Sequence, residues 1–236
     1  MKSVFVTGGS GAVGSAIVRK MTDHGWRVAF CYNKREEQAR ALAAETGAFA
    51  VQANLEDEAS VVAMMEKLEA EFGVPDALVN NAGKTSVMPF ALLDAADWDA
   101  AMSANLKSMF LVTHAVIRGM IRRRSGVIVN MSSIAGQRVL EVPVTYAASK
   151  AGVTGFTLAL AREVACYGIR VNAISPGMLD DGVSANVPEK EKNEYLRYCL
   201  AGRLGACNEV ADLVEFLCSD RASYINAQLI HINGGI

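Results

Sequence analysis

Short apolar runs alternate with longer amphipathic stretches along the whole chain. The apolar runs occupy residues 3–7, 26–32, 48–53, 77–81, 127–131, 169–175 and 229–232. Stretches with helical spacing lie between them; one ends near residue 24 and others cover 60–72, 97–122, 145–166 and 209–218. Strands that alternate with helices are typical of a parallel sheet. The pattern predicts an α/β fold with a doubly wound parallel seven-stranded sheet and helices on both faces, built as a single domain from residues 1–236.

A glycine-rich loop follows the first apolar run immediately. Gly9, Gly11 and Gly14 match the spacing G-x-G-x-x-G, with a predicted strand before them and a predicted helix after them. In this setting glycines permit a tight turn and let phosphate groups approach backbone N–H groups at the helix start. A merely flexible loop would leave this spacing unexplained. The first unit is therefore expected to bind a dinucleotide, which makes the predicted sheet one of the Rossmann type.

The end of the second predicted strand indicates which dinucleotide binds. An enzyme that uses NAD usually has Asp or Glu there, about 20 residues past the glycines, to hold the ribose hydroxyls. Here Tyr32 is followed by Asn33, Lys34 and Arg35. Cations favour a 2′-phosphate because they form charge-assisted hydrogen bonds with it. We therefore expect NADP(H); the alternative is that these cations only begin a solvated helix that continues with two glutamates.

Hydroxyl and amino side chains cluster after the fifth predicted strand. Ser132 and Ser133 stand at its carboxyl end, where open α/β sheets place their ligands. Tyr146 and Lys150 begin the next predicted helix four residues apart, so both project from one face. A nearby cation lowers a phenol pKa from about 10 towards the working pH, where a catalytic group is most effective. A Tyr and a Lys four residues apart would by themselves indicate only an ordinary exposed pair on a helix. The serine at the strand end and the nucleotide loop at the start of the chain favour a catalytic role for this pair.

Composition excludes several classes of function. The 236 residues are 51% hydrophobic and 20% charged, and the formal net charge of −2 with a pI near 6.0 gives no basic field for nucleic acid. The five cysteines have neither C-x-x-C nor metal spacing, so no metal site is predicted. Reduced thiols and the lack of a signal peptide indicate the cytoplasm. No apolar run approaches the length of a membrane span.

Six motifs occur in one order from the first strand towards the end of the chain. They are T-G-x-x-x-x-x-G at 7–14, N-N-A-G at 80–83, N-L-K-S at 105–108, Ser133, Y-A-A-S-K at 146–150 and P-G at 176–177. With these motifs the chain resembles a short-chain dehydrogenase/reductase. Within that family it is most similar to the 3-oxoacyl-[acyl-carrier-protein] reductases, and the similarity runs from residue 3 to the last residue without large insertions.

The resemblance implies a role for each matching position. Tyr146 would be the general acid that protonates the carbonyl oxygen as hydride arrives, and Ser133 would hydrogen-bond that oxygen. Lys150 would hold the nicotinamide ribose and lower the pKa of Tyr146, while Asn105 would anchor a water of the proton relay. The expected cofactor-binding residues are Gly8, Ser10, Gly11, Ala12, Val13, Gly14, Tyr32, Asn33, Lys34, Arg35, Asn54, Leu55, Asn81, Ala82, Gly83, Tyr146, Lys150, Pro176, Gly177, Met178 and Leu179.

The chain departs from the family pattern around the expected cofactor. Ala12 replaces the family's middle glycine, which adds a methyl group beside the pyrophosphate. Gly11 stands where NADPH-dependent members often have a basic residue, and Asn54 where many relatives read the adenine with Asp. After the P-G motif the family usually has a threonine. Here Met178 and Leu179 are followed by two aspartates, which would repel a pyrophosphate unless they point away.

Residues 182–202 contain a polar helical segment, and in this family the region is a mobile lid over the substrate. Tyr195, Leu196, Tyr198 and Leu200 could give the lid an apolar inner side. A plain surface helix is the alternative.

Arg122, Arg123 and Arg124 end the long helix before the fifth strand. Cations suit a helix C-terminus, and the sharper interpretation is a docking patch for an acidic acyl-carrier protein. Tyr167, at a position often basic in carrier-protein reductases, weakens that interpretation. The resemblance also implies a homotetramer in which the seventh strand and helix 209–218 form a dimer interface, although this helix could simply pack on the sheet.

The sequence thus predicts an NADPH-dependent reductase that converts a 3-oxoacyl thioester, bound to acyl-carrier protein, into the 3-hydroxyacyl product in fatty-acid or polyketide-type synthesis. The alternatives are a reductase or dehydrogenase of another ketone or alcohol, and a non-catalytic NADP(H) sensor. A sensor has no need of all four residues Asn105, Ser133, Tyr146 and Lys150. Acyl length, and carrier protein versus coenzyme A ester, do not follow from the sequence.

Overall fold

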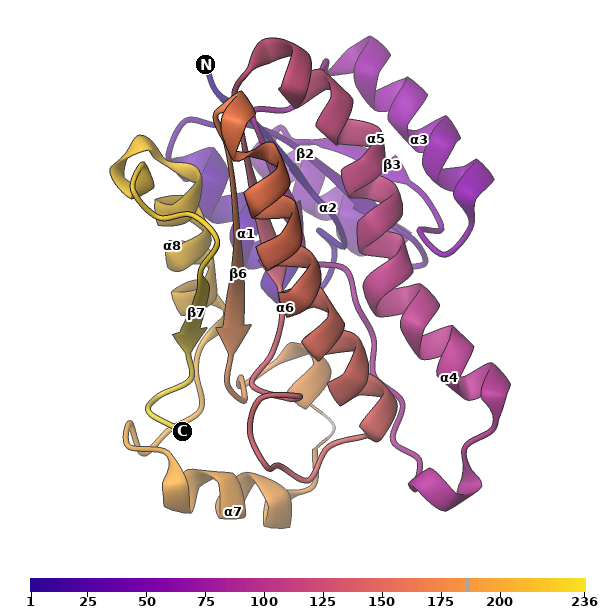
Figure 1. Cartoon of the computed structure of the whole chain (residues 1–236), viewed down its shortest axis with the longest axis vertical. Helices are drawn as coiled ribbons and strands as arrows, with labels where there is room; N and C mark the ends of the chain where they lie inside the picture. Colours follow the sequence, from indigo (N-terminus) through magenta and orange to yellow (C-terminus); the bar gives the residue numbers. More distant parts are fainter. Residues whose placement is uncertain (186) are drawn as a thin grey trace.

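One parallel sheet of seven strands organises the molecule. The computed structural model describes residues 1–185 and 187–236, and its strand order is β3-β2-β1-β4-β5-β6-β7 (Figure 1). Every neighbouring pair is parallel. The strands are β1 (Ser3–Val6), β2 (Arg27–Tyr32), β3 (Phe49–Gln52), β4 (Ala77–Asn80), β5 (Gly126–Met131), β6 (Ile169–Pro176) and β7 (Leu229–Ile232). The predicted doubly wound, Rossmann-type α/β fold is confirmed.

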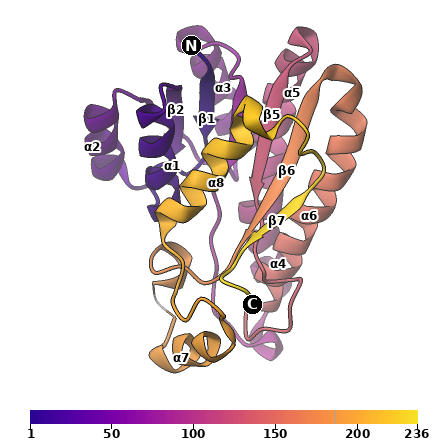
Figure 2. The same cartoon turned by 90° about the vertical axis from the view of Figure 1, so that its left-hand side faces the viewer.

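Helices cover both faces of the sheet (Figure 2). One face is covered by α1 (Ala12–Asp23), α2 (Glu36–Thr46) and α8 (Cys207–Cys218). The other carries α3 (Glu58–Glu71), α4 (Ala95–Met102), α5 (Ser108–Arg123) and α6 (Val144–Val164), while α7 (Glu189–Tyr198) lies beyond the carboxyl ends of the strands. Among the described residues, no helix is long and apolar enough to cross a bilayer.

The strands divide their side chains between two cores, because successive residues of a strand face opposite sides. On β1, Val4 and Val6 enter the core under α1 and α8, whereas Phe5 enters the core under α3, α5 and α6. Helix α8 buries Val210 and Val214 completely in the first of these cores. The sequence left two explanations for the apolar face of α8, a dimer interface and packing on the sheet. Packing within one molecule accounts for this face.

The long helix predicted over 97–122 contains a π-helical turn. Helices α4 and α5 join through Ser103–Lys107, and Ser108 Oγ donates a 2.7 Å hydrogen bond to the Ala104 carbonyl across this turn. A π turn has one residue more than an α turn, and such turns are frequent at functional sites. Asn105 lies inside it and is buried. The residue expected to act in proton relay thus occupies the irregular part of the helix.

The strand order changes direction at β1 and β4. In open α/β sheets, ligands bind outside the carboxyl ends of the strands at such a switch point. The glycine-rich loop follows β1, the N-N-A-G motif closes β4, and Ser132 and Ser133 follow β5. All three reach the edge of the sheet towards which the arrows of β6 and β7 point (Figure 1). The topology therefore brings the separated motifs to one place.

Candidate active site

The glycine-rich loop depends on close backbone contacts. Gly8 has φ +66°, a left-handed conformation that favours glycine. A Cβ on Gly14 would lie 2.2 Å from the Gly8 carbonyl oxygen, and one on Gly9 would lie 2.5 Å from Cβ of Phe30. A Cβ on Gly11 would make only an ordinary 3.4 Å contact. Glycine is thus required where α1 and β2 pack against the loop.

The N-terminus of α1 presents backbone amides to this loop. Gly11 is the N-cap and makes no side-chain cap, so the first N–H groups are available to an anion. The loop after β6 passes over this point, since a Cβ on Gly182 would lie 3.7 Å from Cβ of Ala12. The Asp181 carboxylate accepts a 2.6 Å bond from the Gly182 amide and so caps its own segment rather than α1. These residues fit the pyrophosphate of a dinucleotide.

The segment after β4 is anchored on the glycine-rich loop. Thr7 Oγ1 accepts hydrogen bonds from the backbone amides of Asn81 and Ala82, both at 3.0 Å. Asn81 Nδ2 donates to the Thr7 carbonyl at 3.0 Å, and a Cβ on Gly8 would lie 3.0 Å from Cα of Ala82. The two loops therefore touch and form one continuous surface for the expected cofactor.

The residues expected to select the cofactor stand at the ends of β2 and β3. The Asn33 carbonyl accepts a 2.9 Å bond from Gln52 Nε2, and Asn33 Nδ2 lies 3.5 Å from Asn54 Oδ1. Lys34 and Arg35 are exposed, and within the described part of the chain neither forms an ion pair. Two uncommitted cations beside the nucleotide loop fit a 2′-phosphate.

Ser133, Tyr146 and Lys150 meet beyond the carboxyl end of β5. Ser132 Oγ donates to the Lys150 carbonyl at 3.0 Å, which ties α6 to the strand end. The Lys150 ammonium lies 5.7 Å from the centroid of the Tyr146 ring. Ser132 is buried and holds the scaffold, whereas Ser133 is partly exposed and lies near enough to the phenol of Tyr146 to lower its pKa. The two adjacent serines therefore have different tasks.

The Lys150 ammonium is buried beside the segment after β4. Its Nζ donates a 2.8 Å hydrogen bond to the Met131 carbonyl and lies 3.5 Å from the position of a Cβ on Gly83. Burial disfavours the charged form and lowers the pKa of Lys150 to about 8. The N-N-A-G motif and the Y-A-A-S-K motif are thus in contact through this side chain.

The pKa of Tyr146 is raised above its ordinary value, and the lowering effect expected of Lys150 stays a prediction. Burial of the phenol is the larger cause, and the hydrogen bond with Ser133 only partly opposes it. Lys150 is itself weakened as a cation by burial, and it does not overcome the desolvation of the ring. Tyr146 is therefore protonated at neutral pH, which is the form that a general acid needs.

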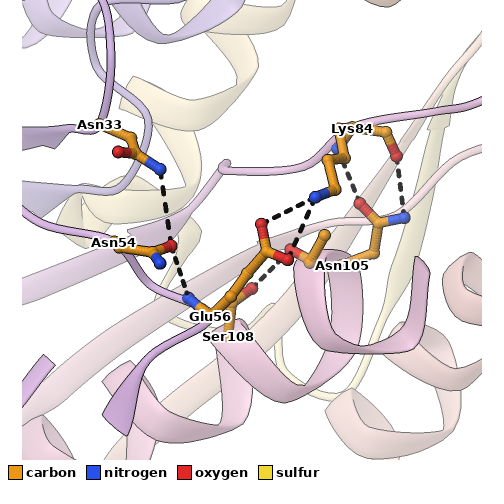
Figure 3. Close-up of polar contacts among 7 residues, drawn as sticks. Asn33, Asn54, Glu56, Lys84, Asn105 and Ser108 are labelled. Carbon is orange, nitrogen blue, oxygen red and sulfur yellow. Dashed lines mark hydrogen bonds and ion pairs between the residues drawn. The ribbon is translucent and has the colours of Figure 1, made fainter. Parts of the chain in front are cut away.

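Three segments converge on the side-chain amide of Asn105. Its Oδ1 accepts a 2.8 Å bond from the Lys84 amide, and its Nδ2 donates to the Lys84 carbonyl at 2.9 Å (Figure 3). Nδ2 also donates to Ser149 Oγ at 3.1 Å, and Ser149 donates to the Tyr146 carbonyl at 2.8 Å. The π turn, the segment after β4 and the start of α6 are joined at this amide.

Tyr195 fastens the predicted lid to the body of the protein. Its hydroxyl accepts a 3.0 Å bond from the Met178 amide and donates to the Asn233 carbonyl at 3.1 Å. Tyr195 is buried, but Tyr198 and Leu200 are 71% and 87% exposed. Of the four side chains expected on the inner side of the lid, Tyr195 and Leu196 thus pack against the body of the protein, and a substrate-facing role of Tyr198 and Leu200 stays a prediction.

The residues after β6 contribute less side chain to the site than expected. Leu179 is buried in the core under α1 and α8, and Met178 packs against the cluster around Tyr195. Pro176 ends β6, and a Cβ on Gly177 would lie 2.8 Å from Cα of Asn233. This stretch therefore offers a cofactor mainly its backbone.

The three consecutive arginines lie at the opposite edge of the sheet. They end α5 just before β5 begins, whereas Ser133 follows the other end of β5. Arg123 donates to three backbone carbonyls, and Arg124 donates to the Cys166 carbonyl at 2.8 Å. Two of these side chains thus have structural partners within the chain, and Arg122 is exposed.

Comparison with known proteins gives the family. A family model described as enoyl-(acyl carrier protein) reductase matches residues 9–236. The 3-oxoacyl-[acyl-carrier-protein] reductase FabG of Staphylococcus aureus strain Mu50 is 38% identical over 240 residues, which cover 100% of this chain and 98% of the relative. FabG of Escherichia coli K12 is 37% identical over 237 residues, with coverage of 100% and 97%. The chain belongs to the short-chain dehydrogenase/reductase family. It is an oxidoreductase.

A solved structure supports the fold over the full length of this short-chain dehydrogenase/reductase. The crystal structure titled ribose-5-phosphate isomerase from Brucella melitensis 16M is similar with a TM-score of 0.92 at 30% identity. The match covers 99% of this chain and 92% of that one. The activity in that title is a statement about the other protein, so the similarity is used here for the architecture.

Several contributors to the site do not follow from the sequence. Thr7 Oγ1 and the Met131 carbonyl hold other parts of the site through contacts that only the folded chain creates. Ser149 carries a weak signal, since a hydroxyl beside Lys150 on the same helical turn as Tyr146 faces the same region. The ion pair of Glu56 with Lys84 joins residues 28 positions apart and has no pattern in the sequence.

Proposed function

We propose that this protein is an NADPH-dependent reductase that converts a 3-oxoacyl thioester, carried by an acyl-carrier protein, into the 3-hydroxyacyl product in fatty-acid or polyketide-type synthesis. The observation that carries the proposal is the meeting of Ser133, Tyr146 and Lys150 beside the glycine-rich loop, at one edge of the sheet. Relatives named 3-oxoacyl-[acyl-carrier-protein] reductases, 37–38% identical over the whole chain, support the substrate class.

The chain's own residues supply the proton and the polar contacts of this reaction. Tyr146, protonated because its pKa is raised, donates its hydroxyl proton to the substrate carbonyl oxygen. Ser133 donates a hydrogen bond to the same oxygen and stabilises the negative charge that develops there. Lys150 and Asn105 assist the return of a proton to the Tyr146 hydroxyl after it has protonated the substrate. The nicotinamide, when bound, supplies the hydride.

NADP(H) is proposed as the cofactor because of the side chains that follow β2. Tyr32 stands at the position where a ribose-binding carboxylate would indicate NAD, and Lys34 and Arg35 follow it as exposed cations. Asn54 replaces an acidic side chain at the end of β3, which removes a negative charge from the same region. The local charge thus suits a 2′-phosphate.

The test is a panel of substrates with both nicotinamides. Loss of NADPH absorbance is followed with an acetoacetyl thioester on acyl-carrier protein, the same acyl group on coenzyme A, unrelated ketones, and an enoyl thioester. The proposal expects the 3-oxoacyl thioesters to give the highest kcat/KM with NADPH. A higher kcat/KM for an unrelated ketone than for the 3-oxoacyl thioesters would identify that ketone as the substrate class instead. Absence of turnover with every compound would favour a cofactor sensor.

A second candidate function is reduction of an enoyl thioester, which the description of the matching family model names. Reduction of a ketone needs hydrogen-bond donors at the oxygen beside the carbon that receives hydride. Tyr146 and Ser133 provide two such donors together. This pair favours the 3-oxoacyl substrate over the enoyl substrate, and the panel separates them.

Assembly, location and lid are further parts of the proposal. We propose a homotetramer, for which exposed Phe110 on α5 and Leu158 on α6 are candidate contacts. The five cysteines are all free, as in the reducing cytoplasm where we place the protein. Residues 182–202 are proposed to move as a lid over the substrate.

A docking patch for the carrier protein at Arg122, Arg123 and Arg124 has a direct test. Arg122 is exposed and has the least structural commitment of the three, so Arg122→Ala removes charge at little cost to the fold. Docking there predicts a higher KM for a substrate on carrier protein and an unchanged KM for the coenzyme A ester. Equal KM values for wild type and variant with both substrates would remove this patch from the proposal.

A further inference from the structure

An ion pair closes over the segment that follows β4. The Lys84 ammonium lies 2.8 and 3.1 Å from the two carboxylate oxygens of Glu56. Figure 3 shows this ion pair with its two dashed contacts. Glu56 follows β3 and Lys84 follows β4, and these strands are separated in the sheet by β2 and β1. The pair therefore bridges the carboxyl edge at the place where the dinucleotide is expected.

Lys84 is also the residue that orients Asn105. Its backbone amide and carbonyl bind Oδ1 and Nδ2 of Asn105 at 2.8 and 2.9 Å, so the two ends of the side-chain amide are both fixed. The orientation of this amide decides which atom remains for a water or a neighbouring donor. One residue thus makes an ion pair with its side chain and positions Asn105 with its backbone.

The segment around Lys84 has few other constraints. Residues 81–89 form neither helix nor strand, and the described backbone hydrogen bonds of residues 83–88 include none to another backbone group. Asn81 and Ala82 are held by Thr7, and the next described anchors are the backbone hydrogen bonds of Lys84 with Asn105 and its ion pair with Glu56. The ion pair therefore ties the Lys84 backbone, and with it the Asn105 amide, to a segment outside the π turn.

The other end of the bridge is fixed to a cofactor-binding loop. Asn54 Oδ1 accepts a 3.2 Å hydrogen bond from the Glu56 amide, which holds the start of this loop in a local turn (Figure 3). Asn54 is itself one of the residues expected at the cofactor. Contacts thus run without interruption from Asn54 through Glu56 and Lys84 to Asn105.

We propose that Glu56 and Lys84 are positioning residues of the reaction: their ion pair holds the segment after β4 where it fixes the Asn105 amide for proton relay. The proposal rests on the proposed reductase activity. Side chains of Glu56 and Lys84 are 34% and 56% exposed, so the pair is accessible to salt and its loss leaves the core intact. Its effect is therefore on the geometry of the site.

The test compares Glu56→Gln, Lys84→Met and the double variant with wild type. We expect each single variant to lower kcat by about 2- to 5-fold, the range that an exposed ion pair supports, with KM for the ketone unchanged. Because the two charges act as a unit, the double variant should lose no more than either single one. Lys84→Arg keeps the positive charge and should have the kcat of wild type, in contrast to Lys84→Met. Salt at 1 M should lower kcat of wild type but not of Glu56→Gln.

The matched control is the exposed pair of Lys2 with Asp220, at the amino edge of the sheet. Asp220→Asn removes a comparable ion pair far from Asn105 and should leave kcat unchanged. Equal kcat for Glu56→Gln and wild type, independent losses in the double variant, or an equal loss in Asp220→Asn would each overturn the proposal.

A second measurement does not depend on turnover. Hydrogen exchange of the Lys84 amide, which is bonded to Asn105, should be faster in Glu56→Gln than in wild type, and equally fast in Asp220→Asn and wild type. If no ketone is reduced by wild type, the reductase function fails while the exchange result still reports on the ion pair. Unchanged exchange in Glu56→Gln would contradict the positioning role by itself.

Discussion

The Lys150 ammonium lies 2.8 Å from the carbonyl oxygen of Met131, the last residue of β5. This bond fixes the side chain at the carboxyl end of the strand, between the N-N-A-G segment and the ring of Tyr146. It satisfies one of three N–H donors of a group that is otherwise buried. The cost of that burial appears in the pKa of Lys150, which falls to about 8.

The pKa of Lys150 predicts a specific dependence of stability on pH. Below pH 8 the ammonium is charged in both the folded and the unfolded chain, and the folded state carries the full penalty. Between pH 8 and 10.5 the unfolded chain binds more protons, so the free energy of unfolding rises with pH, by roughly 3 kcal/mol in total from this group. Denaturant titrations of wild type and Lys150→Met should show that the wild type gains this stability relative to the variant.

The exposed Lys67 gives the control for that experiment, because Lys67→Met removes an ammonium that is not buried and should not reproduce the gain. A constant difference between wild type and Lys150→Met over the same range would contradict the buried, destabilised ammonium. The raised pKa of Tyr146 acts only above pH 10 and is shared by both proteins.

Tyr146→Phe should abolish turnover and retain the cofactor. Removing the hydroxyl takes away the proton donor, and general acid catalysis contributes about 10²- to 10⁴-fold to a rate. The ring remains, so packing near Lys150 changes little. Quenching of protein fluorescence should give similar Kd values for NADPH in both proteins, while single-turnover rates differ. Rates within a few-fold of wild type would show that another group donates the proton.

Lys34→Ala with Arg35→Ala should discriminate between the two nicotinamides. Hydrogen bonds to charged groups contribute about 1.5–3 kcal/mol, so the Kd for NADPH should rise by at least about 10-fold. The Kd for NADH should stay the same, because it has no 2′-phosphate. Arg40→Ala is the matched control, since Arg40 lies on the helix that follows these cations and already pairs with Glu36. An equal rise of the Kd values for NADPH and NADH would contradict recognition of the 2′-phosphate by these two cations.

Two glycine-to-alanine variants should change stability in opposite directions. Gly14→Ala places a methyl 2.2 Å from the Gly8 carbonyl and should cost about 1–3 kcal/mol together with cofactor affinity. Gly155, on α6, has open space where a methyl group would stand, with no atom within 4 Å apart from its chain neighbours and the adjacent backbone of its own helix. Gly155→Ala should therefore add about 0.5–1 kcal/mol through helix propensity. Thermal unfolding measures both, and a stabilised Gly14→Ala would contradict the close packing of the loop.

Tyr195→Phe should loosen the attachment of α7. The change leaves the partly buried Met178 amide without its acceptor, which costs about 1 kcal/mol locally. Faster proteolysis or hydrogen exchange in residues 187–202 should result, with a higher KM for substrate. Tyr198→Phe, on the exposed side of the same helix, should behave as wild type. Similar protection of α7 in both variants would show that other contacts hold it.

The predictable part of this molecule is the part written in local patterns. Alternating apolar runs predict seven strands, and spaced glycines predict the first loop, because burial and backbone freedom act on neighbouring residues. Asn105, Ser133 and the pair of Tyr146 and Lys150 stand in three separate motifs of the sequence and do meet at one edge of the sheet.

What escaped prediction depends on contacts between distant residues. The pKa of Tyr146 rises because of burial by the folded chain, which a spacing of four residues does not report. The inward and outward sides of α7 are decided by Asn233 and Met178, which bind Tyr195 and leave Tyr198 in solvent. The roles of Arg123 and Arg124 are likewise set by carbonyls of neighbouring loops.

The π turn at Ser103–Lys107 makes the position of Asn105 depend on a single codon. Because the turn already accommodates its extra residue, deleting one residue there would let α4 run into α5 as regular helix and would leave the faces of both helices in nearly their present orientation. The loss would fall on Asn105, whose amide meets Lys84 and Ser149 from the irregular backbone of this turn. An inactive relative could therefore arise from an active one through a gap of one residue, and alignments of this region should be inspected for such gaps.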